Sequence, residues 1–265
     1  MRKRFILTVL CAGLFICECT QAQEKAALSA EELAKKLANP IASLISVPFQ
    51  TNLDAGTGST NGSKLVVNIQ PVIPITLTPK LNLITRWILP VVSQFDMGSQ
   101  PSKESGLGDA VITGFLSPTT SKITWGVGPA IVVPTATNAK LGGKKWAIGP
   151  SFVGLKQDGP WTYGALVNHV FSIAGDANRS DISATFFNPF ITYNWKGGAG
   201  LTFNSEYTHD WKNNIDVLII IPTASAVAKF GKQTVSFGIG PRLHLTPSNH
   251  PAYGLRAAIS LVFPK

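Results

Sequence analysis

Two runs near the end of the chain, within residues 233–263, place every second side chain on a wholly apolar face. That face is formed by Val235, Phe237, Ile239, Pro241, Leu243 and Leu245 in the first run and by Tyr253, Leu255, Ala257, Ile259, Leu261 and Phe263 in the second. The opposite face is largely small or polar and carries Arg242 and Arg256. Because successive side chains of a strand point to opposite sides, the two runs predict a β-hairpin. A final strand of this kind suits a closed membrane β-barrel, in which the last strand pairs with the first.

The same period of two recurs between residues 41 and 229 and predicts about twelve strands in all. We place the first strand from Ile41 and the fourth over 108–117. Short turns alternate with longer segments, which span 54–62, 94–105, 135–143, 174–180 and 246–252. The pattern predicts an all-β fold, a transmembrane antiparallel up-and-down β-barrel over 41–265, with both of its ends on the short-turn, periplasmic side.

The composition favours a membrane barrel over a helical membrane protein. Mean hydropathy is +0.18 and 45% of residues are hydrophobic. Beyond the first residues, however, no apolar run approaches the roughly 20 residues of a membrane helix. Inward Val, Ile and Leu could not fill the lumen of a closed barrel of about twelve strands, so we expect the apolar face to meet lipid. The alternative is a soluble secreted sandwich of two sheets, to which this volume argument does not apply.

The N-terminal segment predicts export followed by a short helix. Residues 1–22 combine three basic residues, an apolar stretch and a small-residue cleavage site, as a signal peptide does. All three cysteines lie in this segment, so its removal would leave none. Residues 23–40 form a leader whose helix is capped by Ser29 and Glu32 and ended by Pro40. The leader either plugs the barrel or caps its periplasmic floor.

Aromatic and proline residues bear on the barrel in opposite ways. Two interfacial girdles are expected from Trp125, Trp161, Tyr163, Tyr193 and Trp195 beside the short turns, and from Tyr207, Trp211 and Tyr253 near the longer loops. Eight prolines fall within the proposed strands, where each removes a backbone donor: Pro48, Pro71, Pro90, Pro129, Pro150, Pro189, Pro222 and Pro241. We therefore expect bulges at several of them. The apolar run after Asp216 leaves the register of the tenth strand open.

Short motifs along the chain include Asn68-Ile69-Gln70-Pro71, Ser105-Gly106-Leu107-Gly108-Asp109, Trp125-Gly126-Val127-Gly128-Pro129 and Leu261-Val262-Phe263-Pro264. With these motifs the chain resembles the outer-membrane β-barrel family named for the meta-pathway of phenol degradation. The similarity covers almost everything after residue 22, but its motifs are structural. The resemblance implies an outer-membrane location and uptake of small solutes, including aromatic ones. It implies no catalytic residue.

Charged and polar residues with inward parity are the candidate site. The predicted pore-lining residues are Lys64, Arg86, Asn204, Glu206, Asp210, Asp216, Arg242 and Arg256. They could line an open pore and select solutes by charge. They could equally form an internal salt-bridge network that closes the lumen, since buried charges need partners. The sequence does not fix the relative heights of the strands, so both interpretations stay open.

Other chemistries find less support in the sequence. The formal net charge is +9, but no Lys and Arg cluster interleaved with aromatic residues indicates nucleic-acid binding. The four histidines lack metal-ligand spacing, and we expect no metal or cofactor. His169 and His209 have the outward parity of a catalytic His in lipid-modifying barrels. Neither has a serine two residues away, so we do not predict an enzyme.

These observations predict a passive channel or transporter for small solutes, including aromatic ones, in the outer membrane of a Gram-negative bacterium. Its expected partners are membrane lipid and the solutes, and its oligomeric state stays open. The alternative is a non-conducting structural barrel whose lumen is sealed by the charged residues. A lipid-modifying enzyme with its site at the rim is a less favoured alternative.

Overall fold

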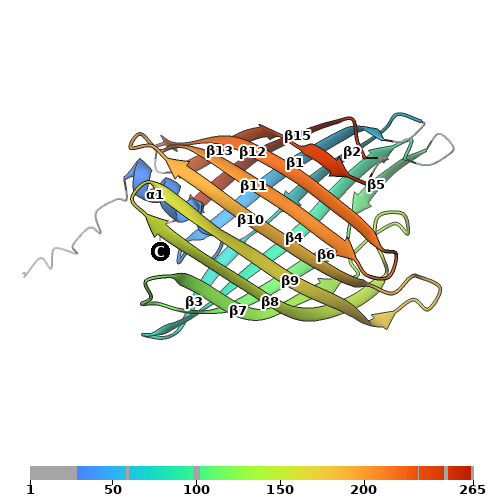
Figure 1. The fold of residues 1–265 in the computed structure, drawn as a ribbon, viewed down its shortest axis with the longest axis horizontal. Coiled ribbons are helices and arrows are strands. Elements are labelled where there is room, and N and C mark those ends of the chain that lie inside the picture. Colours follow the sequence, from blue (N-terminus) through green and yellow to red (C-terminus); the bar gives the residue numbers. More distant parts are fainter. Residues whose placement is uncertain (1–28, 58–59, 98–101, 232, 248–249, 264–265) are drawn as a thin grey trace, which may run out of the picture.

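The chain folds into a closed barrel of twelve antiparallel strands with one short helix at one end (Figure 1). The computed structural model describes residues 29–57, 60–97, 102–231, 233–247 and 250–263. The predicted signal peptide, 1–22, and the first part of the leader, 23–28, lie outside the described residues. In the described part of the chain, no helix is both long enough and apolar enough to cross a membrane.

In chain order the elements are α1 (Ala30–Leu37), β1 (Ile45–Thr57), β2 (Gly62–Ile69), β3 (Val72–Thr78), β4 (Leu81–Phe95), β5 (Lys103–Leu107), β6 (Ala110–Pro118), β7 (Thr124–Val133), β8 (Lys145–Asp158), β9 (Trp161–Gly175), β10 (Ser183–Asn194), β11 (Ala199–Asp210), β12 (Ile215–Phe230), β13 (Gln233–Pro241), β14 (Leu243–Thr246) and β15 (Tyr253–Phe263). Three crossings of the barrel are interrupted. Both β2 and β3 pair with β1 and β4, both β5 and β6 pair with β4, and both β13 and β14 pair with β12.

The barrel closes between its first and last strands, as predicted. Ile45 of β1 lies opposite Phe263 of β15, and the pairing continues to Ala55 opposite Tyr253. The register of the tenth strand, which the sequence left open, is continuous toward β11, with which residues 215–226 of β12 pair without a shift. Toward β14 the register shifts between Leu218 and Ile219. The sheet that results has no edge to expose to lipid.

Three strand boundaries differ from the predicted ones. Ile41 lies before β1, where its N–H donates to Asn39 Oδ1 at 2.9 Å, and its side chain turns into the lumen with 2% exposure. The loops predicted over 54–62 and 94–105 are shorter, because β1 and β4 extend with polar residues still alternating inward. The fourth crossing, predicted at 108–117, gains the separate strand β5 before it.

The two ends of the barrel differ as the sequence predicts. Tight turns join β8 to β9, β10 to β11 and β12 to β13 at the end that holds α1 and the end of β15 (Figure 1). Most connections at the other end are longer, with two exceptions: only four residues separate β1 from β2, and only a short turn after Asp210 joins β11 to β12. In this turn Asp210 Oδ1 accepts from the N–H groups of Lys212, at 2.8 Å, and Asn213, at 3.1 Å.

The outer surface of the barrel is apolar and carries exposed aromatic rings. Exposed side chains on β4, β8, β10 and β11 include Trp87, Phe152, Phe187 and Phe203. At the short-turn end, the ring of Tyr193 packs edge-to-face against Trp161 at 4.8 Å and against Trp195 at 5.1 Å. Trp211 and Tyr253 are exposed at the opposite end. This surface is the one that the alternation predicts for contact with lipid.

The lumen is less polar than the volume argument predicts. Apolar side chains of β4, β6, β8 and β9 fill one side of it, and we call this group the apolar wall: Ile84, Phe115, Val153, Leu155 and Leu166. Ile41, from the segment before β1, and Val72 from β3 pack against it. The volume argument did not consider a large ring such as Phe115 of β6, or Ile41 from the segment before β1, and both occupy lumenal space here.

Helix α1 is placed at the short-turn end of the barrel. Ser29 and Glu32 form the predicted capping box, in which Glu32 N donates to Ser29 Oγ at 3.2 Å and Ser29 N donates to Glu32 Oε2 at 2.8 Å. Leu33 is buried against Ala42, Leu44 and Val262. The carbonyl of Lys35 accepts from Gln157 Nε2 at 2.7 Å, which ties the helix to the barrel. The helix therefore occupies part of the mouth at the short-turn end as a docked element.

Three of the strand prolines follow a glycine and coincide with gaps in the hydrogen-bonded ladder. Pairing stops around Pro129 between β6 and β7, around Pro150 between β8 and β9, and around Pro241 between β12 and β13. The register is the same on both sides of each gap, so the bulges expected at these prolines are absent. A Cβ on Gly128 would overlap the carbonyl oxygen of Gly114, and one on Gly149 would overlap that of His169. The strand opposite therefore packs directly against the glycine.

Candidate functional site

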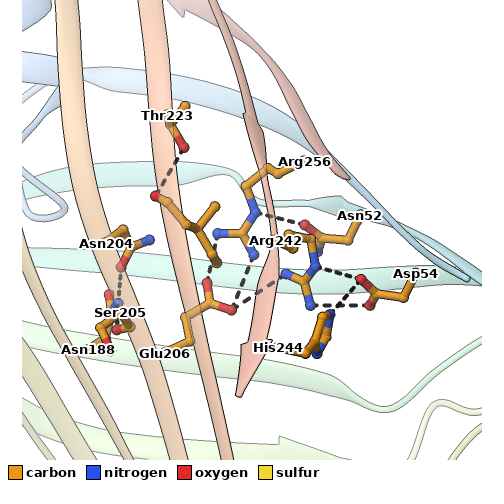
Figure 2. Close-up of polar contacts among 11 residues, drawn as sticks. Asn52, Asp54, Asn188, Asn204, Ser205, Glu206, Thr223, Arg242, His244 and Arg256 are labelled. Carbon is orange, nitrogen blue, oxygen red and sulfur yellow. Dashed lines mark hydrogen bonds and ion pairs between the residues drawn. The ribbon is translucent and has the colours of Figure 1, made fainter. Parts of the chain in front are cut away.

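Glu206 and Arg256 form the centre of a charged cluster inside the lumen. Glu206 comes from β11 and Arg256 from β15, and the guanidinium contacts both carboxylate oxygens, at 2.8 and 3.2 Å (Figure 2). Arg256 Nε also donates to Asn52 Oδ1 on β1 at 2.7 Å. This two-pronged geometry is the strong form of an Arg–carboxylate pair. It links β11 to β15 across the lumen, because these strands are not neighbours in the sheet.

A second pair joins the cluster from the residue between β13 and β14. Arg242 contacts Asp54 of β1 through Nε, at 2.9 Å, and through Nη2, at 3.2 Å. His244 Nε2 lies 2.9 Å from the same Asp54 Oδ1. Arg242 Nη1 is 3.7 Å from Glu206 Oε2, which connects the two pairs without a hydrogen bond. We call these five residues the charged cluster: Asp54, Glu206, Arg242, His244 and Arg256.

Two further cations lie on other inward positions. Arg86 of β4 donates through Nη2 to Gln70 Oε1 at 2.7 Å, so it is held by an amide and not by a carboxylate. Lys64 of β2 lies opposite Asp54 in the register, and no ion pair of Lys64 is found among the described residues. With Arg242 and Arg256 there are four cations against the two carboxylates of the cluster, an excess of two positive charges.

A cavity of about 290 Å³ lies between this charged region and the leader. Its walls include Gln70 and Arg86 on one side, Asn188 and Asn204 on another, and the leader near Leu37. Asn204, predicted to line the pore, does contact this space, and its Oδ1 accepts a hydrogen bond from Asn188 Nδ2 (Figure 2). A second cavity of about 170 Å³ continues beside α1. The lumen thus contains unfilled volume near the charges.

Two of the predicted pore-lining residues stand apart from the cluster. Asp210 binds the turn that follows β11, as described above. Asp216 pairs in register with His209 of β11, and its Oδ1 accepts from Tyr207 O–H at 2.6 Å and lies 2.9 Å from His209 Nδ1. Tyr207 and His209 alternate with the lumenal Glu206. The structure therefore places Asp216 on the outer face of the barrel, in place of the lumenal position predicted for it.

The outer face also holds His169, the other histidine considered for catalysis. Its Nδ1 lies 2.9 Å from Thr185 Oγ1, which accepts from Trp211 Nε1 at 2.8 Å. His169, Thr185 and His209 lie opposite one another on the neighbouring strands β9, β10 and β11. They form a polar row on the otherwise apolar outer surface. The Nδ1 atom of His209 already contacts Asp216 Oδ1, at 2.9 Å.

Sequence reasoning missed three residues of the cluster and its surroundings. Asp54 was assigned to a loop, although continuing the alternation of Gln50 and Asn52 by one step would have placed it inward in β1. His244 shares the polar face of Arg242, so the same alternation indicated it. The role of Gln70 as partner of Arg86 had no sequence signal, because it depends on the height of β2 relative to β4.

Comparison with solved structures supports the fold. The COG4313 outer membrane channel from Pseudomonas putida F1 is similar, with 17% sequence identity and a TM-score of 0.66, over 85% of this chain and 97% of that one. Outer membrane phospholipase A from Escherichia coli gives 11% identity and a TM-score of 0.44, over 89% and 99% of the two chains. No protein-family model and no curated protein sequence matches the chain. The chain thus shares the barrel fold of the Pseudomonas putida protein, and its resemblance to the meta-pathway family stays a prediction.

Proposed function

We propose that the chain is a passive outer-membrane channel for small solutes, including aromatic ones. The observation that carries the proposal is the unfilled lumenal volume beside an excess of positive charge. A cavity of about 150 Å³ is large enough to bind benzene. The space of about 290 Å³ next to Arg86 and Asn204 can therefore hold a molecule with one aromatic ring. Diffusion through such a lumen needs no cofactor.

The charges give the proposed channel a direction of selectivity. Lys64 and Arg86 are not neutralised by a carboxylate among the described residues, whereas Arg242 and Arg256 are paired. A lumen with net positive charge concentrates anions and repels cations. The apolar wall faces the same space from the other side. We therefore expect a preference for small anions and for solutes that combine a ring with a negative group.

Planar-bilayer recordings of the purified protein test the proposal. The wild-type protein should give discrete openings and, in a salt gradient, a reversal potential that favours anions. The double variant Lys64→Gln with Arg86→Gln should shift that potential toward zero, because the paired charges remain in place. Lys196→Gln is the matched control, since Lys196 is exposed in the turn after β10. A protein that folds but shows no openings would support the sealed, structural alternative.

The outer-membrane location is part of the proposal and has its own test. Separation of cell membranes by density should recover the protein with the outer membrane. Its migration on a denaturing gel should depend on heating, as a closed barrel resists detergent until it is boiled. Recovery as a soluble folded protein would exclude the location.

A further inference from the structure

Each of the five hairpins at the short-turn end of the barrel carries one exposed lysine. The lysine lies either in the turn itself or in the last three residues of the strand before it. We call these residues the lysine rim: Lys80, Lys122, Lys156, Lys196 and Lys229. The hairpins follow one another around the sheet from β3 to β13, so the lysines are distributed around the end of the barrel that also holds α1 (Figure 1).

The geometry of these turns does not require lysine. Gly159, Gly198 and Gly231 have positive φ values and make three of the reversals, and Pro79 lies in the turn between β3 and β4. Turn conformation selects residues of these types, together with Asn, Asp and Ser. The exposed lysines stand beside them, so turn geometry does not explain why all five hairpins carry a positive charge.

The positive charge of the lysine rim is almost uncompensated. Lys156 Nζ lies 3.3 Å from Asp158 Oδ2, and no ion pair of the other four lysines is found in the part of the chain that the structure describes. Helix α1 adds no net charge, because it carries two glutamates and two lysines. Over the described residues of this end, five lysines against one carboxylate leave an excess of four positive charges.

Basic residues at the other end of the barrel have partners within the fold. Three lysines there form ion pairs: Lys140 with Glu104 at 2.6 Å, Lys144 with Asp176 at 3.8 Å, and Lys145 with Asp181 at 3.0 Å. Arg179 Nη2 donates to the carbonyl oxygens of Ala139 and Gly142, at 2.7 and 2.6 Å. Charge at that end therefore holds the loops together, whereas the lysine rim makes almost no such contacts among the described residues.

The lysine rim lies at the level of the aromatic residues of the short-turn end. Lys196 directly follows Trp195, and Lys156 lies opposite Tyr163 in the pairing of β8 with β9. The rings of Trp195 and Tyr163 are exposed. Exposed Trp and Tyr rings mark the boundary between the hydrocarbon and the headgroups of a bilayer. A lysine beside such a ring can lay its apolar stem along it and extend its ammonium group to the headgroups.

We propose that the lysine rim binds the phosphate groups of anionic phospholipids in the bilayer leaflet at the short-turn end, which the sequence predicts to face the periplasm. Basic residues next to a membrane surface attract anionic lipid. The lysines are spaced singly, one to each hairpin, which suits several small ligands better than one macromolecule bound to one side. The inference goes beyond the proposed channel function and rests only on the membrane location proposed with it.

Quenching of tryptophan fluorescence by brominated lipid tests the selectivity for lipid. A reporter form with Trp87→Phe, Trp146→Phe and Trp211→Phe keeps only the three tryptophans of the short-turn end, Trp125, Trp161 and Trp195. It is reconstituted in phosphatidylcholine vesicles with a rising fraction of brominated phosphatidylglycerol, and the quenching gives the ratio of the two association constants. The anionic lipid should be preferred about fivefold in 0.02 M salt, the factor that about 1 kcal/mol for one lysine represents. In 1 M salt the ratio should fall toward one, because the Debye length is then only about 3 Å.

Substitution of the four lysines that lack an ion pair tests the lysine rim itself. The rim variant carries Lys80→Gln, Lys122→Gln, Lys196→Gln and Lys229→Gln, and its ratio should fall from about five to about one. The matched control removes four exposed lysines of the other end and should keep the ratio: Lys103→Gln, Lys140→Gln, Lys144→Gln and Lys212→Gln. Arginine at the same four rim positions should also keep it, because the charge is retained.

Heat-dependent gel migration shows whether each form is folded. If the rim variant does not fold, the four single variants take its place, and each should lower the ratio in part. A ratio of about one in the wild-type protein would overturn the inference, and so would an unchanged ratio in the folded rim variant or in all four single variants. An unchanged ratio together with lost sedimentation on purified peptidoglycan would assign the lysine rim to the anionic cell wall instead.

Planar-bilayer recordings separate this inference from the channel proposal. A wild-type protein without openings but with a ratio of about five would overturn the channel and leave the lysine rim as proposed. Normal openings with a ratio of about one would overturn the lipid site alone.

Discussion

The two sides of the lumen are filled in opposite ways. The apolar wall occupies its side with hydrocarbon, and Phe115 and Val153 are completely buried. The charged cluster occupies the other side with Asp54, Glu206 and three basic side chains, and the cavity of about 290 Å³ lies beside Arg86 and Asn204. The apolar wall connects the strands by close packing and has no charge. The charged cluster connects strands by ion pairs, and its charges also attract or repel ions in the lumen. The comparison indicates that stability depends mainly on the first side and selectivity on the second.

Removing the largest ring of the apolar wall should have the largest effect on stability. Phe115→Ala leaves a cavity in a packed site, and such truncations cost about 3–5 kcal/mol. Denaturant unfolding in detergent, followed by the gel shift, would measure the loss. Leu116→Ala, on the exposed outer face of the same strand, is the control and should cost much less. Equal losses would show that the apolar wall does not carry the stability.

Glu206→Gln tests the other half of the comparison. The change leaves Arg256 without its carboxylate and removes the ion pair of Arg242 with β11. Breaking a buried pair costs about 3–5 kcal/mol, and because the Glu206 side chain is 23% exposed we expect about 2 kcal/mol. The reversal potential should shift further toward anions. The double variant Glu206→Gln with Arg256→Gln should recover part of the lost stability and part of the shift in reversal potential. A failure to do so would show that the two residues do not act as a pair.

His244→Ala should have a smaller effect, because Asp54 keeps both of its bonds to Arg242. The net contribution of one hydrogen bond is about 1 kcal/mol. The expected loss in unfolding free energy is of that size, with little change in ion selectivity at neutral pH. A loss as large as that of Glu206→Gln would place His244 at the centre of the cluster.

The smallest effect on the barrel should come from its helical cap. Helix α1 lies at the short-turn mouth of the barrel, and Ser29→Ala removes its capping box. Loss of an N-cap costs about 1 kcal/mol of helix stability. The expected result is a roughly fivefold faster trypsin cleavage at Lys35 and Lys36, the factor that 1 kcal/mol represents, with unchanged barrel unfolding. A change in ion selectivity would show that the helix, and not the walls, controls the lumen.

Acid should loosen the same cap. Hydrogen bonds from the backbone and side chain of Ser29 lower the pKa of Glu32 from its ordinary value of 4.5. A lowered pKa means that Glu32 stabilises the helix above pH 4.5 and that this contribution is lost as the pH falls below that value. Current fluctuations in bilayers should therefore increase below pH 4.5 in the wild type. Glu32→Gln, which cannot ionise, should show no such dependence.

The barrel was predictable because its main signal is local. Alternation in residues 233–263 and along the earlier strands follows directly from the geometry of a strand beside lipid. Closure between β1 and β15 followed from the need to leave no edge. The strand ends were less certain, since Asp54 is a turn residue by propensity and is held in β1 by its pairing with Arg242.

The site was only partly predictable, because it depends on how far each strand is shifted along its neighbour. Glu206, Arg242 and Arg256 were recognised from their inward parity, but their pairing required the heights that the register supplies. The face on which Asp216 lies could not be predicted, because the apolar run that follows it does not show which alternate residues of β12 point inward. The buried ring of Phe115 had no counterpart in a volume argument that considered only a hollow lumen.

The pairing of Ile45 with Phe263 has a consequence for biogenesis. The residues that shut the cylinder lie at opposite ends of the described chain, so their contact is among the most distant in sequence that the fold makes. Contacts of this kind form late. The polypeptide must therefore avoid aggregation until β15 is in place, and a chain that lost β15 would leave β1 unpaired.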